Sequence, residues 1–377
     1  MKITSPRESL LNGLQAVQSV VASRSSLPIL SNVLLSAEPG HIELRATDLE
    51  VSVVCRVEAN VERIGATTLP VKRLFGLIRE MQGGEVTLEV SEKEVSTLQA
   101  GASLYKINGI AGEEFPRLPQ FKEEPALKIT QSKLKEMIRK TLYAVSTEES
   151  RHVLNGVYFN VQEDKLTMVA TDGRRLALSE EEAGEGKSTK VEFIIPSRSV
   201  GELSRNLIGN GEVEMRVNKG GGTDGAPQQV EFCILSEGKS PVRICSKLIE
   251  GNFPNFKQVI PKEMKERVTI IREELLQALR RADNITSERN SSVKLNFSKN
   301  RLSITANSPD VGEGRENIAI NYKGPEISIA FNPTFLMDPL KVLESDEIHI
   351  ELIDDNSPAI IKSNTPFLYV LMPMRSN

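Results

Sequence analysis

The stretch with the most reactive side chains in the shortest space is residues 170–178, which read Ala-Thr-Asp-Gly-Arg-Arg-Leu-Ala-Leu. It places one carboxylate, Asp172, two positions before the first of two adjacent guanidinium groups, Arg174 and Arg175. An Asp side chain can accept a hydrogen bond from the backbone two residues on, and Gly tolerates a positive φ. Residues 171–173 are therefore predicted to form a turn, with the two arginines on it or just past it and Leu176 returning to a strand.

The other side chains that could do chemistry are scattered. The histidines His41, His152 and His349 stand singly, whereas nucleophilic or acid–base catalysis needs partners that are held together. The three cysteines show no CxxC spacing and are expected to be buried thiols of a reducing compartment. Gly220–Gly222 follows a predicted strand but lacks the Lys-Ser or Lys-Thr of a phosphate loop, so it is interpreted as a hairpin tip. The sequence indicates no enzyme, no metal site and no cofactor.

The composition is that of an ordinary globular protein. The chain has 377 residues, of which 39% are hydrophobic and 26% charged. No apolar run reaches the roughly 18 residues that span a bilayer, and no signal-peptide core is present at the N-terminus, so we expect a cytosolic protein. A net charge of −4 argues against a tight, all-over nucleic-acid coat but leaves room for a basic face. With no Trp, stacking on single-stranded bases is not expected to be the main mode of binding.

The turn has an echo upstream at Ala46–Glu50 and a fainter one downstream at Ala306–Ser308, each after a predicted strand. Spacings of about 124 and 136 residues are typical of one domain-sized unit that occurs three times. Gly112–Pro116 and Gly251–Pro254 both end in Phe-Pro and are expected to mark the ends of units. We therefore expect three domains, at residues 1–124, 125–256 and 257–377.

Each repeat is predicted to contain two helices and about eight strands. Ser5, Pro6 and Glu8 predict a capping box at the first helix, and Asn332 with Pro333 predicts the start of the last helix. Hairpin-length connections make the strands antiparallel. Helices must cover one face of each sheet, since a lone sheet would expose its apolar face. The expected fold class is α+β. Positive charge gathers on the helices and acidic residues crowd the loops.

Several motifs, in order along the chain, closely resemble those of the bacterial DNA polymerase III β subunit family, the sliding clamps. They are Leu27-Pro28-Ile29-Leu30, Ala46–Glu50, Phe115-Pro116, Leu154-Asn155-Gly156, Ala170–Ala177, Phe253-Pro254 and Met372-Pro373-Met374-Arg375. The resemblance covers all three repeats. It implies a head-to-tail homodimer of six domains, closed as a ring around double-stranded DNA. The implied partners are the DNA polymerase III catalytic subunit, the clamp loader and other proteins with a clamp-binding motif.

The resemblance also implies two sets of site residues. The expected client-peptide pocket comprises Leu154, Thr171, Gly173, Arg174, Arg175, Leu176, Pro254, Val259, Val370, Met372, Pro373, Met374 and Arg375. In it, Leu, Val and Met would form an adaptable apolar surface, while Arg175 and Arg375 would hold polar or acidic peptide groups. The expected DNA contacts are Arg24, Lys72, Arg73, Arg151 and Arg198. Gln258 and His152-Val153 depart from residues found in some members.

An apolar strand at the end of the first repeat is expected to close the ring. Tyr105 and Ile107 would pack against Ile285 of a second copy, because an edge strand with exposed apolar residues needs a cover. Two other functions stay open at this point. One is a peptide-binding scaffold that uses the same pocket without a ring. The other is a repeat-built hydrolase, which would need a catalytic cluster that the sequence does not supply.

Overall fold

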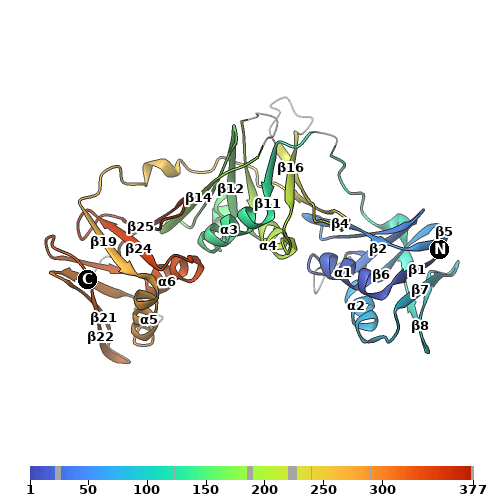
Figure 1. The fold of residues 1–377 in the computed structure, drawn as a ribbon, viewed down its shortest axis with the longest axis horizontal. Helices are drawn as coiled ribbons and strands as arrows, with labels where there is room; N and C mark the ends of the chain where they lie inside the picture. Colours follow the sequence, from blue (N-terminus) through green and yellow to red (C-terminus); the bar gives the residue numbers. More distant parts are fainter. Residues whose placement is uncertain are drawn as a thin grey trace. The chain divides into compact units, whose positions relative to one another are not determined.

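The computed structural model describes residues 1–21, 27–121, 124–184, 190–219, 227–238, 240–287 and 291–374. Within these ranges the strands pair antiparallel and each repeat contributes two α-helices (Figure 1). The expected α+β class is therefore confirmed. Arg24, Arg375 and the Gly-rich insertion from Gly220 onward lie outside the described residues.

The chain divides into two compact units. The first consists of Met1–Lys135, Ala183–Thr189 and Arg198–Leu248, and the second of Glu136–Glu182, Lys190–Ser197 and Ile249–Asn377. The division runs through the middle repeat, because some of its strands extend a sheet of the first repeat and others extend a sheet of the third. The three domain boundaries expected above stay a prediction.

The first unit contains two sheets. The five-stranded sheet has the order β5-β1-β7-β8-β9, with strands Asn60–Arg63, Lys2–Pro6, Glu85–Val90, Val95–Ala100 and Ser103–Asn108. The nine-stranded sheet has the order β10-β6-β2-β3-β4-β18-β17-β16-β11, with strands Ile110–Ala111, Gly65–Pro70, Asn32–Glu38, His41–Thr47, Val51–Glu58, Val242–Lys247, Pro227–Ile234, Glu212–Lys219 and Leu127–Thr130. Its helices are α1 (Arg7–Gln18), α2 (Val71–Glu80), nearly all of α4 (Ser197–Asn206) and the first part of α3 (Gln131–Thr141).

The second unit also contains two sheets. The eight-stranded sheet has the order β15-β12-β13-β14-β26-β25-β24-β19, with strands Val191–Pro196, Gly156–Gln162, Lys165–Thr171, Arg175–Glu182, Phe367–Leu371, Ala359–Lys362, Glu347–Leu352 and Glu266–Ile271. The four-stranded sheet has the order β22-β21-β20-β23, with strands Gly312–Ala319, Arg301–Ser308, Val293–Ser298 and Ile327–Phe331. Its helices are α5 (Arg272–Asp283), α6 (Pro333–Val342) and the rest of α3.

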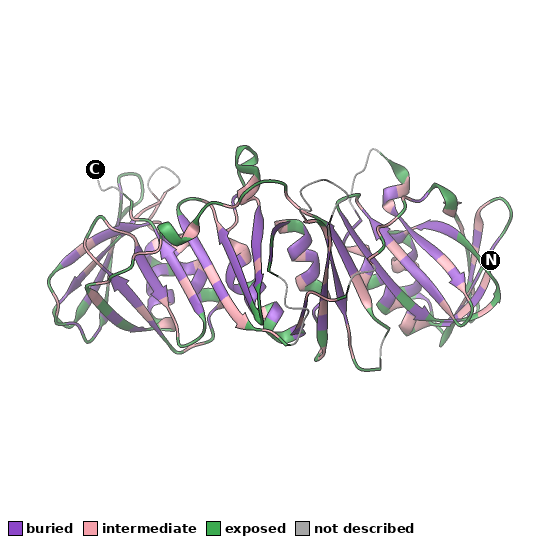
Figure 2. Ribbon diagram, turned by 90° about the horizontal axis from the view of Figure 1, so that it is seen from above, coloured by how far each residue is buried: buried purple, intermediate pink, exposed green. Residues whose placement is uncertain are grey.

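The helices cover one face of the sheets, as a buried apolar core requires. α1 packs beside α2, and α5 beside α6 (Figure 1). α1 lies so close to β4 that a Cβ on Gly13 would come within 2.4 Å of Val57 Cγ2, so only glycine fits there. Figure 2 shows the buried positions running along the strands of both units.

Two helix starts test the local predictions. The cap of α6 is confirmed, because Asn332 Oδ1 accepts a hydrogen bond from Phe335 N at 3.2 Å and Pro333 is the first helical residue. The capping box at α1 is wrong. Ser5 is a residue of β1, its hydroxyl donates to Glu58 O at 2.7 Å, and α1 begins at Arg7 without a side-chain cap. The strand pairing of Ser5 thus removes it from the helix end.

The downstream counterpart of the turn, predicted at Ala306–Ser308, also differs from the prediction. Ala306–Ser308 belongs to β21 and pairs with β22, so the turn follows these residues instead of containing them.

Candidate functional site

The turn that follows β13 has the geometry expected from its sequence. Asp172 Oδ1 accepts from the backbone N–H groups of Arg174 and Arg175, at 2.9 and 3.0 Å. Thr171 Oγ1 donates to Arg175 O at 2.6 Å, and Gly173 has φ +85°, a conformation that favours glycine. The turn holds β13 and β14 in a fixed hairpin and leaves Gly173 and Arg174 exposed.

Arg175 is buried, with 9% of its side chain exposed, and its guanidinium is bound within the chain. Nε donates to Asp172 Oδ2 at 3.0 Å, Nη1 to Asp338 Oδ2 at 2.6 Å and Nη2 to Tyr143 O at 2.7 Å. The group also lies over the Phe335 ring, 4.2 Å from its centroid. Its expected role of holding acidic peptide groups is therefore revised, because Arg175 ties β14 to α6 instead.

Burial opposes the charge of Arg175, but its neighbours outweigh that effect. Tyr369, the hydrogen bond that Arg175 donates to Asp338 and the Asp172 charge hold the pKa of the guanidinium above its ordinary value. Arg175 therefore stays charged, and it stabilises the turn and α6 together.

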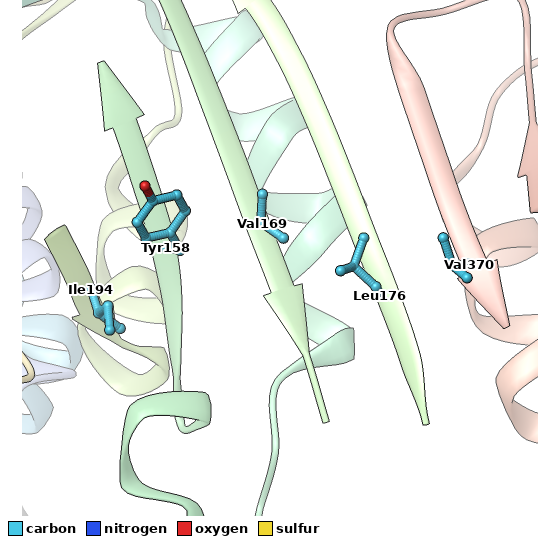
Figure 3. Packing of buried hydrophobic residues seen from close by; sticks show 5 residues of the cluster. All are labelled: Tyr158, Val169, Leu176, Ile194 and Val370. Atoms are coloured by element: carbon cyan, nitrogen blue, oxygen red, sulfur yellow. The ribbon is translucent and has the colours of Figure 1, made fainter. Parts of the chain in front are cut away.

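An apolar floor lies beside the turn on the eight-stranded sheet. It consists of Tyr158, Val169, Leu176, Ile194 and Val370, which come from five different strands (Figure 3). Strand register brings them together, since Tyr158 pairs with both Ile194 and Val169, and Leu176 pairs with Val370. Successive residues of a strand point to opposite faces, so these positions share one face.

The segment after Leu248 packs against this floor. Phe253 stacks on the Tyr158 ring with centroids 4.9 Å apart, and Phe256 and Ile260 pack against the same cluster. Burial raises the pKa of the Tyr158 phenol, which donates to Glu192 Oε2 at 2.7 Å. These anchors fix the backbone on which Pro254 and Val259 stand, both exposed.

The C-terminal segment forms the third side. β26 ends at Leu371, and then Met372 N donates to Arg174 O at 3.0 Å and Met374 N to Ala330 O at 2.8 Å. Met372 is 42% exposed and Met374 38%, although both are apolar. After Leu371 the chain leaves the eight-stranded sheet, and the bridge between Met374 and Ala330 ties it to β23.

The structure thus brings most of the expected pocket residues together, and we call this region the client surface after its expected role, which stays a prediction. Thr171, Gly173 and Arg174 form its turn, Leu176 and Val370 lie in its floor, and Leu154 ends the short helix beside it. The sequence analysis did not place Tyr158, Val169, Ile194 and Phe256 beside these residues, and it named Phe253 only as part of a motif. Strand alternation and the Phe-Pro motif were the signals that could have predicted this packing.

The expected DNA contacts differ in their surroundings. Lys72 and Arg73 are exposed in the first turn of α2. Arg198 is bound within its unit, with Nη2 at 2.8 Å from Asp48 Oδ2 and 3.1 Å from Val20 O. Arg151 Nη1 donates to Asp172 O at 2.7 Å, and Nε lies 3.0 Å from Glu148 Oε2. Arg198 therefore binds the turn that contains Asp48, and Arg151 binds the turn that contains Asp172. A contact with DNA stays a prediction for all five residues.

The residues expected at a dimer interface lie at sheet edges. β9 ends the five-stranded sheet, with Tyr105 45% exposed and Ile107 half-buried. Ile285 follows α5 and faces Gly314 of β22, the edge strand of the four-stranded sheet. Between α5 and β22 is a cavity of about 400 Å³, lined by residues that include Glu273, Gln277, Arg281 and Ile318.

In the described part of the chain, no three His, Cys, Asp or Glu side chains come close enough to hold a metal ion. Burial raises the pKa of the Cys55 and Cys245 thiols to about 12, so they are protonated and poor nucleophiles. No described helix is both long enough and apolar enough to cross a membrane.

Comparisons with known proteins agree with this arrangement. Three family models of the DNA polymerase III β subunit match the chain: the N-terminal domain at residues 1–119, the central domain at 128–255 and the C-terminal domain at 257–375. The β sliding clamp of Chlamydia muridarum is 34% identical over 381 residues, covering 100% of this chain and 99% of that protein. The β sliding clamp of Vibrio cholerae is 30% identical over 385 residues, covering 100% of both.

Solved structures agree as well. The DNA polymerase sliding clamp of Bacillus subtilis has a TM-score of 0.92 at 28% identity, with 100% of both chains covered. A sliding clamp of Bartonella birtlesii, crystallised bound to griselimycin, has a TM-score of 0.91 at 35% identity, again with 100% of both chains covered.

Proposed function

Since the chain belongs to the DNA polymerase III β subunit family, we propose that it acts as a sliding clamp, a processivity factor that tethers replication and repair proteins to duplex DNA. Members of this family are accessory subunits and not enzymes, and this fits the chain, whose candidate catalytic side chains are scattered. In a bacterial cell a sliding clamp acts in the cytoplasm.

The client surface is the observation that carries the tethering part of the proposal. Its floor is apolar and its rim has two exposed methionines, Met372 and Met374. Methionine repacks around ligands of different shape, so such a surface suits short peptides with Leu or Phe anchors from several partners. We propose that the DNA polymerase III catalytic subunit, the clamp loader and other clamp-binding-motif proteins bind there.

The ring would form through the two sheet edges. β9 of one copy would lie beside β22 of a second copy, with Tyr105 and Ile107 against the surroundings of Ile285. Each of these edge strands pairs on one side only within the described residues, and an uncovered apolar edge is a liability in solution. A head-to-tail contact that closes after two copies makes a ring. The three domains of each copy are proposed at residues 1–124, 125–256 and 257–377.

The ring would hold DNA mainly by linkage and only weakly by affinity. Lys72 and Arg73 are exposed on α2, while the chain as a whole carries a net charge of −4. A few contacts to phosphates hold a duplex without reading its sequence, so the ring can slide. Arg24, Arg151 and Arg198 are proposed as further contacts.

Sedimentation equilibrium separates this function from a peptide scaffold without a ring. A clamp is expected to sediment as a dimer of twice 41.7 kDa at micromolar concentration, with and without a client peptide. A protein that stays monomeric and still binds the client peptide would instead favour the peptide scaffold. The family match would then describe the fold and the client surface alone.

A further inference from the structure

The first unit contains a second copy of the backbone frame that supports the client surface. Asp48 Oδ1 accepts from the N–H groups of Glu50 and Val51, at 3.0 and 2.8 Å, as Asp172 Oδ1 does in the other turn. Lys247 N donates to Glu50 O at 2.9 Å, the same bond that the C-terminal segment makes to its own turn. The junction of β4 with β18 therefore repeats the junction of β14 with β26.

The side chains on the two frames differ. Strand register gives two pairs of the apolar floor a counterpart in the first unit, Leu34–Arg45 for Tyr158–Val169 and Ser52–Cys245 for Leu176–Val370. Val54–Arg243 likewise corresponds to Leu178–Leu368, which packs against that floor. Two of the apolar positions are thus occupied by arginine. The surface is cationic where the client surface is apolar.

Three guanidinium groups converge on one carboxylate at this place. Glu43 is 2% exposed, with its carboxylate oxygens 2.5 Å from Arg45 Nη2, 3.2 Å from Arg56 Nε and 3.4 Å from Arg243 Nη2. Burial works against the charge of Glu43, but the three arginines outweigh it and hold the pKa of the carboxyl below its ordinary value. Glu43 is therefore ionised, and it offsets only one of three positive charges.

The arginines also reach solvent. Their side chains are 35%, 51% and 41% exposed for Arg45, Arg56 and Arg243. Other carboxylates on this face include Glu38 and Glu58 at strand ends and Glu231 of β17. Glu38 is 3.2 Å from His41 Nε2, and Glu231 Oε2 is 3.2 Å from Arg216 Nη1. Each guanidinium has five N–H donors in a planar fork, so most of the donors are left for another acceptor.

The face on which the cluster lies indicates what that acceptor is. α1 packs on the side of β4 that carries Cys55 and Val57, and the arginines occupy the opposite side because strand residues alternate. Lys72 and Arg73 stand on α2 and Arg198 on α4, so the duplex is not expected at this face. Carboxylates suit the fork geometry, as Glu43 already demonstrates, and clusters of arginine are a known mode of acidic-motif recognition.

We propose that Arg45, Arg56 and Arg243 form a second binding surface, which takes an acidic peptide segment of a partner protein. The choice of a peptide over a free anion rests on the proposed function, since the same frame in the second unit is assigned to peptides. A partner with an apolar motif and an acidic segment could then be held at two places on one chain.

The probe is a fluorescently labelled hexaglutamate peptide, followed by anisotropy at low and at physiological salt. The triple variant Arg45→Gln, Arg56→Gln, Arg243→Gln should lose at least about tenfold in affinity, because charge-assisted hydrogen bonds disappear. The matched control Arg79→Gln, Arg267→Gln, Arg301→Gln removes the same charge from exposed positions elsewhere and should bind within about twofold of the original protein. Equal losses in both variants, or no binding by the original protein, would overturn the proposal.

A second variant excludes misfolding as the cause. Glu43→Gln releases the three arginines from their internal partner, so it should bind hexaglutamate several-fold more tightly, and an unfolded protein cannot do that. Unchanged or weaker binding contradicts the proposal. Inorganic phosphate is added as a competitor, at a concentration that supplies the same amount of negative charge as the peptide. If it displaces the peptide, the assignment to a peptide is wrong.

Removal of residues 372–377 separates the two sites. It should leave hexaglutamate binding unchanged, so a failure of the client surface and a failure of the arginine cluster give different results.

Discussion

Replacement of Arg175 by alanine should destabilise the second unit strongly, although the residue next to it can be replaced at little cost. The variant removes three hydrogen bonds and two cation–π contacts. Asp172 and Asp338, 16% and 17% exposed, lose their shared cation, although Asp338 keeps its ion pair with Lys341. Breaking a buried ion pair by removing one partner costs about 3–5 kcal/mol. Because both carboxylates keep some access to water, we expect about 3 kcal/mol.

Thermal unfolding followed by calorimetry measures this cost. For a unit of this size, the loss corresponds to a fall of roughly 6–12 °C in the unfolding temperature. Two transitions are expected, since a chain with two units need not unfold in one step, and only the transition of the second unit should move. The unfolding temperature of Arg175→Lys should lie between those of the original protein and Arg175→Ala, because an ammonium cannot bind three separated acceptors at once.

Arg174→Ala is the matched control. Arg174 is exposed, and its contribution to the site is the backbone carbonyl that accepts from Met372, which alanine retains. Its cost should stay within about 0.5 kcal/mol, as for most surface positions. If Arg175→Ala and Arg174→Ala unfold at the same temperature, Arg175 does not tie β14 to α6 and the assigned role is wrong.

Four other predictions test separate parts of the molecule. Deletion of residues 372–377 should weaken a Leu/Phe-containing polymerase tail peptide at least about thirtyfold in calorimetric titration, since anchors of this kind contribute about 2 kcal/mol or more, and equal affinities would place the site elsewhere. Ile285→Lys should give monomers in ultracentrifugation, because an unpaired ammonium would be buried at the interface, and a persistent dimer would move that interface.

Lys72→Gln with Arg73→Gln should lower the salt dependence of DNA binding by about one unit of slope per lost phosphate contact, and an unchanged slope would remove both from the DNA face. The depressed pKa of Glu43 means that its stabilisation is full above the ordinary glutamate value and is lost as the pH falls through the folded value. Glu43→Gln should therefore flatten the acid side of the pH–stability curve of the first unit, and two parallel curves would refute it.

Local patterns predicted local structure well. The turn at Asp172 and the cap at Asn332 formed as expected, because each depends on side chains that bond their own backbone two or three residues away. Ser5 has the same kind of side chain and failed as a cap, since β1 takes it into a sheet. The predicted turns and caps formed, except where strand pairing with a distant part of the chain used the same residue.

Long-range pairings were beyond the sequence patterns. Asp338, the partner of Arg175, lies 163 positions away along the chain, and no spacing indicates it. Nor did the repeats show that β18 would pair with β4 and β26 with β14, so the middle repeat contributes to two sheets. These pairings place Leu176 beside Val370 and Arg243 beside Glu43, and so decide which of the two repeated frames is apolar and which is cationic.

The behaviour of the protein on circular DNA tests the central claim most directly. The protein is loaded onto nicked circular DNA by its clamp loader and ATP, and the DNA is then separated from free protein by gel filtration at a salt concentration that removes simple electrostatic binding. A ring linked to the DNA should stay with the circle and leave when one restriction cut makes it linear. Protein that is lost from the intact circle, or that stays on the linear DNA, would contradict the account.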